Sequence, residues 1–244
     1  VRINESIKSD KLRKNHQLQN IFEHVINKES TLHIMGLMSN GGVHSHIDHY
    51  KYILSLARNV GVPKIAVHAF MDGRDTSPTS GIEYIKQLES WLALDDGYRI
   101  ATICGRYYSM DRDSRWDRIE LAYKLLVHSE GQIFPDAEAA IHESYKKEIT
   151  DEFIRPAIIS KPIPLRNGDA LLSMNFRADR MRQILTAIND PHFSHFTTEP
   201  LNIFFTCMTE YKKDFPFPVL FSTEKINNIF PEILSQNNYR QLRI

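Results

Sequence analysis

The sequence predicts an α/β fold in which a largely parallel sheet is flanked by helices, with a less regular insert around residues 128–168. Two observations carry this prediction. Short runs of almost uninterrupted apolar residues recur along the chain, which is typical of strands that are buried on both faces. Each run is followed by a segment whose apolar residues recur at helical spacing, so the repeating unit is strand, loop and helix.

Three strand–helix units come first along the chain. Their strands and helices are expected at residues 32–38 and 47–57, 64–70 and 82–92, and 99–104 and 116–125. Gly61 is well placed to end the first of these helices. The apolar faces of all three helices can then pack on the sheet.

The C-terminal half continues the pattern after the insert. Further strands are expected at residues 170–176 and 202–207, with a helix at residues 181–188 between them. Within the insert, residues 136–148 form an acidic and then basic helix that leads into a Pro-rich connection. The insert can form either an antiparallel edge or a helical cover. The run at residues 239–244 is typical of a strand that begins near the end of the chain.

Composition limits the classes of function. Of the 244 residues, 42% are hydrophobic and 25% are charged, which excludes a disordered chain. Lys+Arg (30) balance Asp+Glu (30), so no strongly basic surface is available for a nucleic-acid partner. No apolar run approaches the about 20 residues that a membrane span requires.

Cys104 and Cys207 lie far apart, which favours a reducing compartment over a disulfide framework. Because the chain starts at Val1, we expect it to be part of a longer polypeptide.

Charged side chains gather in the loops that follow four of the predicted strands. These side chains are His44, Arg74, Asp75, Arg106, Arg112, Arg177 and Arg180. In open α/β sheets, ligands bind beyond the carboxyl ends of the strands. The planar guanidinium matches phosphate or carboxylate with two hydrogen bonds, so the pattern predicts an anion-binding site.

A simpler explanation exists for individual arginines, because nearby aspartates could neutralise them. On this explanation Arg112 pairs with Asp111 or Asp113, and Arg180 pairs with Asp179. The sequence contains no Walker loop, no G-x-G-x-x-G and no G-x-S-x-G element. We therefore expect an anion-binding chain that carries no clear nucleophile of its own.

One local motif suggests a different chemistry. His44, His46, Asp48 and His49 fit the pattern H-x-H-x-D-H, which is the zinc-ligand pattern of metallo-β-lactamase-like dizinc hydrolases. Such a site needs further His and Asp ligands from later loops, and these loops supply arginines instead. The dizinc hydrolase is therefore the alternative hypothesis. The other explanation of His46 and His49 is that they are polar residues on the first turn of a helix.

Four segments together resemble the 2,3-bisphosphoglycerate-independent (cofactor-independent) phosphoglycerate mutases. They are residues 39–46 (SNGGVHSH), 68–75 (HAFMDGRD), 105–113 (GRYYSMDRD) and 175–180 (NFRADR). The resemblance extends over essentially the whole chain but covers only part of that enzyme. It implies a phosphotransferase (substrate-binding) domain at residues 1–222 and a segment at residues 223–244 that returns toward a phosphatase domain.

The resemblance also implies a function. The family interconverts 3-phosphoglycerate and 2-phosphoglycerate in glycolysis and gluconeogenesis, through a phosphoserine that would lie outside this chain. The phosphatase domain of the same polypeptide resembles alkaline phosphatases and would hold two Mn2+ ions, so no metal ligand is expected here. The seven loop residues would contact phosphoglycerate, with Asp75 as the acid/base for its hydroxyl groups. We expect a cytoplasmic monomer with no nucleic-acid or membrane partner, and no mutase activity from this chain alone.

Overall fold

The computed structural model describes residues 2–222, 230–237 and 239–242. Its strands form one eight-stranded sheet in the order β4-β5-β3-β2-β1-β6-β7-β8. The strands are β1 (Leu32–Leu37), β2 (Ile65–Met71), β3 (Tyr98–Gly105), β4 (Gln132–Phe134), β5 (Ala157–Ile159), β6 (Ala170–Ser173), β7 (Phe204–Thr209) and β8 (Val219–Phe221). Neighbouring strands are parallel except β3 and β5, so the predicted largely parallel sheet is confirmed.

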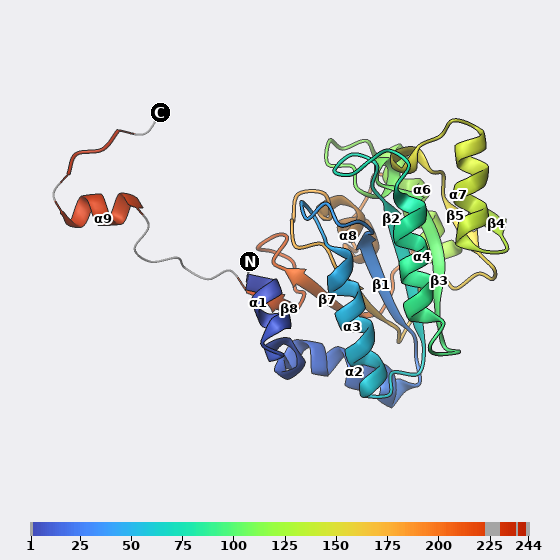
Figure 1. The fold of residues 1–244 in the computed structure, drawn as a ribbon, viewed down its shortest axis with the longest axis horizontal. Coiled ribbons are helices and arrows are strands. Elements are labelled where there is room, and N and C mark those ends of the chain that lie inside the picture. The colour runs from blue at the N-terminus through green and yellow to red at the C-terminus, as the bar shows by residue number, and fades with distance from the viewer. Residues whose placement is uncertain (1, 223–229, 238, 243–244) are drawn as a thin grey trace.

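Helices cover both faces of this sheet (Figure 1). The described helices are α1 (Arg2–Lys8), α2 (His16–Lys28), α3 (Ile47–Asn59), α4 (Gly81–Leu92), α5 (Arg106–Ser109), α6 (Trp116–His128), α7 (Ala137–Lys146), α8 (Arg182–Asn189) and α9 (Phe230–Gln236), with 3-10 turns η1 (Lys11–Lys14) and η2 (Asp151–Phe153). In Figure 1, helix α9 lies away from the sheet and does not cover it. The buried side chains of α2, α3, α4 and α7 belong to one core cluster, and those of α6 and α8 belong to a second. The sheet separates the two clusters.

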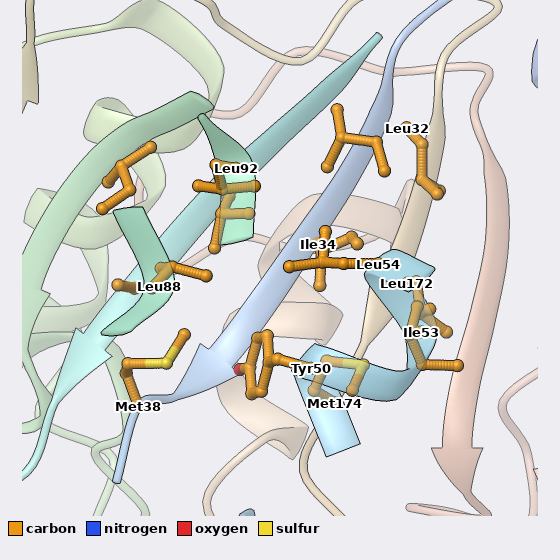
Figure 2. Close-up of a cluster of buried hydrophobic side chains, with 14 of the residues drawn as sticks. Leu32, Ile34, Met38, Tyr50, Ile53, Leu54, Leu88, Leu92, Leu172 and Met174 are labelled. Atoms are coloured by element: carbon orange, nitrogen blue, oxygen red, sulfur yellow. The ribbon is translucent and has the colours of Figure 1, made fainter. Parts of the chain in front are cut away.

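The central strand β1 shows why the apolar runs are uninterrupted. All six of its residues are buried. Leu32 and Ile34 belong to the cluster with Leu54 of α3 (Figure 2), whereas Met35 and Leu37 belong to the cluster on the opposite face. Burial of each such side chain contributes about 1.5–3 kcal/mol. Both faces of the strand therefore require apolar residues, and the polar residues are left to the loops.

The insert combines the two forms that the sequence left open. Strand β5 pairs antiparallel with β3, and β4 extends the sheet beyond β5. Helix α7 lies beside these strands (Figure 1) and packs its buried alanines into the core. The side chain of Asp136 accepts a hydrogen bond from the backbone N–H of Ala139 at 2.7 Å, which fixes the start of this helix.

The structure adds elements at both ends that the sequence pattern did not predict. Helices α1 and α2 precede the first strand, and β8 forms the far edge of the sheet. At the C-terminal end, residues 239–242 have no regular secondary structure, so this part of the strand expected at residues 239–244 is absent. Residues 243–244, like residues 223–229 at the expected domain boundary, lie outside the described residues. No described helix is long and apolar enough to cross a membrane.

Candidate anion-binding site

The topology brings four loops to one edge of the sheet. Strands β3, β2, β1 and β6 are neighbours and run parallel, so the loops after them start at the same edge. These four loops carry all seven predicted site residues. Ion pairs and hydrogen bonds join most of the seven into two groups, one around Asp72 and one around Asp179.

Asp72 is the buried centre of the first group. Its Oδ2 accepts the hydroxyl hydrogen of Ser39 at 2.6 Å, and its Oδ1 accepts the backbone N–H groups of Arg74 and Asp75 at 3.2 and 3.0 Å. Arg106 adds an Nη1 hydrogen bond at 2.7 Å. Burial opposes the ionised form, but these four donors outweigh it and lower the pKa of Asp72. The carboxylate therefore stays charged and fixes the conformation of residues 72–75.

Arg106 is also buried, and it bridges two carboxylates. Its Nη1 donates to Asp75 Oδ2 at 2.6 Å as well as to Asp72. Burial by itself disfavours the charge, but hydrogen bonds to Asp75 and Asp72 raise the pKa of Arg106. This guanidinium is held by the protein itself, so its main effect is to hold the carboxylate of Asp75 in place.

Asp179 is the centre of the second group. Its Oδ2 accepts from Arg112 Nη1 at 2.6 Å, and its Oδ1 lies 3.1 Å from Arg177 Nε and 3.7 Å from His44 Nδ1. Burial opposes ionisation, but Arg112, Arg177 and His44 lower the pKa of Asp179. Both arginines are exposed, so they can bind a ligand while Asp179 orients them.

His44 lies between the two groups. Its Nε2 is 4.0 Å from Asp75 Oδ2, while its Nδ1 faces Asp179. Burial, assisted by the charge of Arg106, lowers the pKa of His44 to about 4, so the imidazole is neutral at pH 7. Its backbone carbonyl accepts the N–H of Phe176 at 2.8 Å, which joins the loop after β1 to the loop after β6.

Arg180 is the cation that the protein leaves least neutralised. It donates to the backbone carbonyl of Met110 at 3.0 Å and forms no ion pair with a carboxylate in the described part of the chain. Burial, followed by repulsion from Arg106 and Arg112, lowers the pKa of Arg180. Arg74 is exposed and pairs with Glu152 at 3.2 Å. A bound anion would relieve the repulsion at Arg180, so the geometry favours an anionic ligand.

The explanation that Arg112 and Arg180 pair with aspartates adjacent in the sequence is wrong. Arg112 pairs with Asp179 rather than Asp111 or Asp113, which are held by Arg115. Arg180 does not pair with Asp179. The true partners are set by the folded loops rather than by neighbouring positions in the sequence.

The structure also contradicts the zinc interpretation of the histidine motif. The side chain of His46 caps helix α3 by accepting the N–H of Asp48 at 3.2 Å, and His49 Nε2 lies 2.7 Å from Asn4 Oδ1. Asp48 Oδ2 lies 3.6 Å from His46 Nδ1, and 75% of the Asp48 side chain is exposed to solvent. Among residues 2–222, 230–237 and 239–242, no group of three or more His, Cys, Asp or Glu side chains could hold a metal ion. The motif is the start of a helix.

Sequence reasoning missed the organising role of Asp72 and Ser39 and gave Asp179 only a local partner. Asp72 and Asp75 flank Gly73 and Arg74 in one strand-end loop, and this concentration of carboxylates among cations was the available signal. The contribution of Ser39 requires the loops after β1 and β2 to be side by side.

This architecture defines the class: an α/β domain in which arginines from strand-end loops gather at one edge of a largely parallel sheet. Within that class, the chain belongs to the family described as BPG-independent PGAM N-terminus (iPGM_N), whose model matches residues 3–213.

Individual relatives agree with this assignment. The chain is 44% identical to the 2,3-bisphosphoglycerate-independent phosphoglycerate mutase of Clostridium novyi and 42% identical to that of Myxococcus xanthus, in both cases over its full length. It spans about half the length of these relatives, covering 49% and 48% of them. A solved structure of Leishmania mexicana phosphoglycerate mutase at low cobalt concentration superposes with a TM-score of 0.87 at 29% identity, covering 97% of this chain and 46% of that one.

Proposed function

We propose that this chain is the substrate-binding part of a phosphoglycerate mutase that interconverts 3-phosphoglycerate and 2-phosphoglycerate in glycolysis and gluconeogenesis. The observation that carries the proposal is the convergence of arginines from three strand-end loops around Asp75 and His44. Phosphoglycerate has a carboxylate and a phosphate, and two anionic groups of this kind require several guanidiniums. The names of the full-length relatives support the same function.

The residues divide into two roles in this proposal. Arg112, Arg177 and Arg74 are exposed and would bind the anionic groups, together with the half-buried Arg180. Asp75 would exchange a proton with the glycerate hydroxyls, because Arg106 holds one of its oxygens and the side chain is still partly exposed. Positioning of this kind fixes the glycerate so that either hydroxyl can meet the phosphoryl group.

We assign the remaining machinery to other parts of the polypeptide. The residues that the structure describes form no cluster of metal-ligating side chains, so they do not fit a metal centre. In this proposal, the phosphoserine and the two Mn2+ ions would belong to a phosphatase domain related to alkaline phosphatases. Residues 1–222 would form the phosphotransferase domain, and residues 223–244 would lead toward the phosphatase domain. The whole protein would act as a monomer in the cytoplasm.

Calorimetric titration of the chain with 3-phosphoglycerate, in EDTA at low salt, tests the proposal. We expect tighter binding than with inorganic phosphate, because phosphate alone satisfies fewer of the guanidiniums. Arg112→Ala should weaken 3-phosphoglycerate binding by about 1.5–3 kcal/mol, the size of a hydrogen bond between charged groups. Arg106→Ala is a poorer test, since it leaves Asp72 and Asp75 without their buried partner.

The matched control is Arg99→Ala, since Arg99 lies near the start of β3 at the opposite end of the strand. Its affinity for 3-phosphoglycerate should equal that of the unchanged chain. Equal affinity for phosphate and 3-phosphoglycerate would contradict the proposal and would favour a general anion-binding module. Unchanged affinity in Arg112→Ala would remove Arg112 from the site.

A further inference from the structure

Two buried polar atoms of the site face each other without a hydrogen-bond partner. They are His44 Nδ1 and Asp179 Oδ1, which are 3.7 Å apart. Asp179 Oδ1 also lies 3.1 Å from Arg177 Nε, as an ion pair without hydrogen-bond geometry, whereas among the described residues His44 Nδ1 has no such contact except Asp179. A buried polar atom without a partner is costly and needs an explanation. A small movement of the loop that carries Asp179 would bring the two atoms within hydrogen-bond distance. The residues on either side are already joined, because Phe176 and Arg177 direct their N–H groups at the His44 carbonyl.

The surroundings of the imidazole decide which of its nitrogens carries the hydrogen. A neutral imidazole has one N–H, and two carboxylates compete for it: Asp179 beside Nδ1 and Asp75 beside Nε2. Asp75 Oδ2 already accepts a hydrogen bond from Arg106 at 2.6 Å and lies farther away, at 4.0 Å. Asp179 Oδ1 is closer to its nitrogen, and although it forms an ion pair with Arg177 Nε at 3.1 Å, it accepts no hydrogen bond in the part of the chain that the structure describes. The hydrogen therefore belongs on Nδ1.

The charges around the site keep Asp179 an acceptor. Arg112 and Arg177 both contact its carboxylate, so it remains ionised and has no hydrogen to donate. Arg106, on the other side of the imidazole, disfavours a second proton on His44. With Nδ1 protonated, Nε2 presents a lone pair toward Asp75 and the arginines.

We propose that Asp179 is a positioning residue that holds His44 in the Nδ1–H tautomer, so that Nε2 accepts a hydrogen bond from a hydroxyl group of the bound ligand. The identity of that ligand as phosphoglycerate rests on the proposed function, but the tautomer does not. The same carboxylate orients Arg112 and Arg177, so one residue aligns the hydrogen-bond acceptor for the hydroxyl with two cations for the anionic groups. In other enzyme sites, a carboxylate that accepts a hydrogen bond from one imidazole nitrogen sets the tautomer in the same way.

The test is nitrogen-15 NMR of the histidine-labelled chain at pH 7, with the His44 signals assigned by comparison with His44→Gln. We expect a protonated Nδ1 and an unprotonated Nε2 in the unchanged chain. Asp179→Ala removes the acceptor beside Nδ1 and leaves Asp75 beside Nε2, so we expect the hydrogen to move to Nε2. The control is Asp113→Ala, which removes an equal charge from a residue that pairs with Arg115 instead. It should leave the His44 tautomer unchanged.

Each outcome decides the inference. A protonated Nε2 in the unchanged chain overturns it, and this result needs no variant to fold. An unchanged tautomer in a folded Asp179→Ala overturns it as well. Addition of saturating 3-phosphoglycerate then separates the two proposals. A shift of the His44 Nε2 signal supports both, whereas the expected tautomer with no response to 3-phosphoglycerate supports the role of Asp179 and counts against the proposed ligand.

Discussion

Asp72 determines the shape of the anion-binding site more directly than any arginine does, because its carboxylate accepts from four donors in three loops. Asp72→Ala removes that acceptor and leaves the buried guanidinium of Arg106 with Asp75 alone. We expect a loss of about 3 kcal/mol in the free energy of unfolding, the cost of breaking a buried ion pair. Urea denaturation measures it. Asp48→Ala is the control, since that side chain is 75% exposed, and an equally small effect in both variants would contradict the prediction.

The positions of the site residues could be predicted from sequence, but their partners could not. Arg74, Arg106 and Arg177 each follow a recognisable strand, and parallel neighbours bring strand ends together. The pair between Arg112 and Asp179 joins residues 67 positions apart. Such a pair depends on the angles at which two loops leave the sheet, which the sequence pattern does not encode.

Gly105 shows how closely the loops are packed at the level of secondary-structure elements. A Cβ on this residue would lie 2.2 Å from the backbone oxygen of Glu152 in η2, and that backbone has no room to move without breaking the contact between β3 and residue 154. Gly105→Ala should therefore cost about 1–3 kcal/mol in unfolding free energy. It should also weaken 3-phosphoglycerate binding several-fold, because Arg106 is the next residue. Calorimetry and urea denaturation measure the two effects.

The matched substitution is Gly61→Ala, where a Cβ meets nothing within 4 Å but the backbone φ is +80°. This variant should lose about 1 kcal/mol of stability through backbone strain alone and retain its affinity for 3-phosphoglycerate. Equal affinities in the two variants would show that η2 does not support Arg106.

Asp151 joins three elements, and its titration makes the free energy of unfolding depend on pH in a direction that can be worked out. The residue is fully buried in η2, and it accepts the N–H of Gly81 at the start of α4 and the hydroxyl hydrogen of Tyr145 in α7. Burial raises its pKa from 3.8 to about 6. Between about pH 4 and pH 6 the folded chain then binds more protons than the unfolded chain, so this group lowers the free energy of unfolding as pH rises.

Asp151→Asn removes that titration. The unfolding free energy of the variant minus that of the unchanged chain should rise between pH 4 and pH 7, by about 1.4 kcal/mol for each unit that separates the folded and unfolded pKa values. Asp72 titrates in both proteins and cancels from the difference. Urea denaturation at several pH values measures the difference, and a difference independent of pH would show that Asp151 titrates normally.

Element length decides what could be predicted of the fold. Strands β1, β2 and β3 were predicted because each has six or seven consecutive buried residues, which face both sides of the sheet. Strands β4, β5 and β8 have three residues each, which is too few for any period to be visible. These short strands form by pairing with strands beside them in the sheet: β5 with β3, β4 with β5, and β8 with β7. Helix α2, by contrast, carries the helical spacing of Leu18, Ile21 and Val25 and could have been predicted.

At the scale of the whole molecule, the proposed function predicts that substrate binding and phosphoryl transfer take place in different parts of the polypeptide. All seven predicted site residues come from four loops at one edge of a single sheet, so the candidate anion site lies within this chain. In the proposed reaction, the phosphoryl group needs an acceptor while the glycerate is held in place. The proposed acceptor is a phosphoserine elsewhere in the polypeptide. We therefore expect the chain alone to bind 3-phosphoglycerate without converting it.

Phosphorus-31 NMR of the chain incubated with 3-phosphoglycerate and Mn2+ measures the conversion, since the substrate and product phosphates have separate signals. We expect no 2-phosphoglycerate beyond the amount in a sample without protein. If product does form, Arg112→Ala identifies its source. A contaminating mutase would be unaffected by that substitution, whereas turnover by this chain would fall, because Arg112 is exposed at the site and oriented by Asp179. A fall would show that the chain carries its own phosphoryl acceptor, so binding and transfer would belong to the same domain.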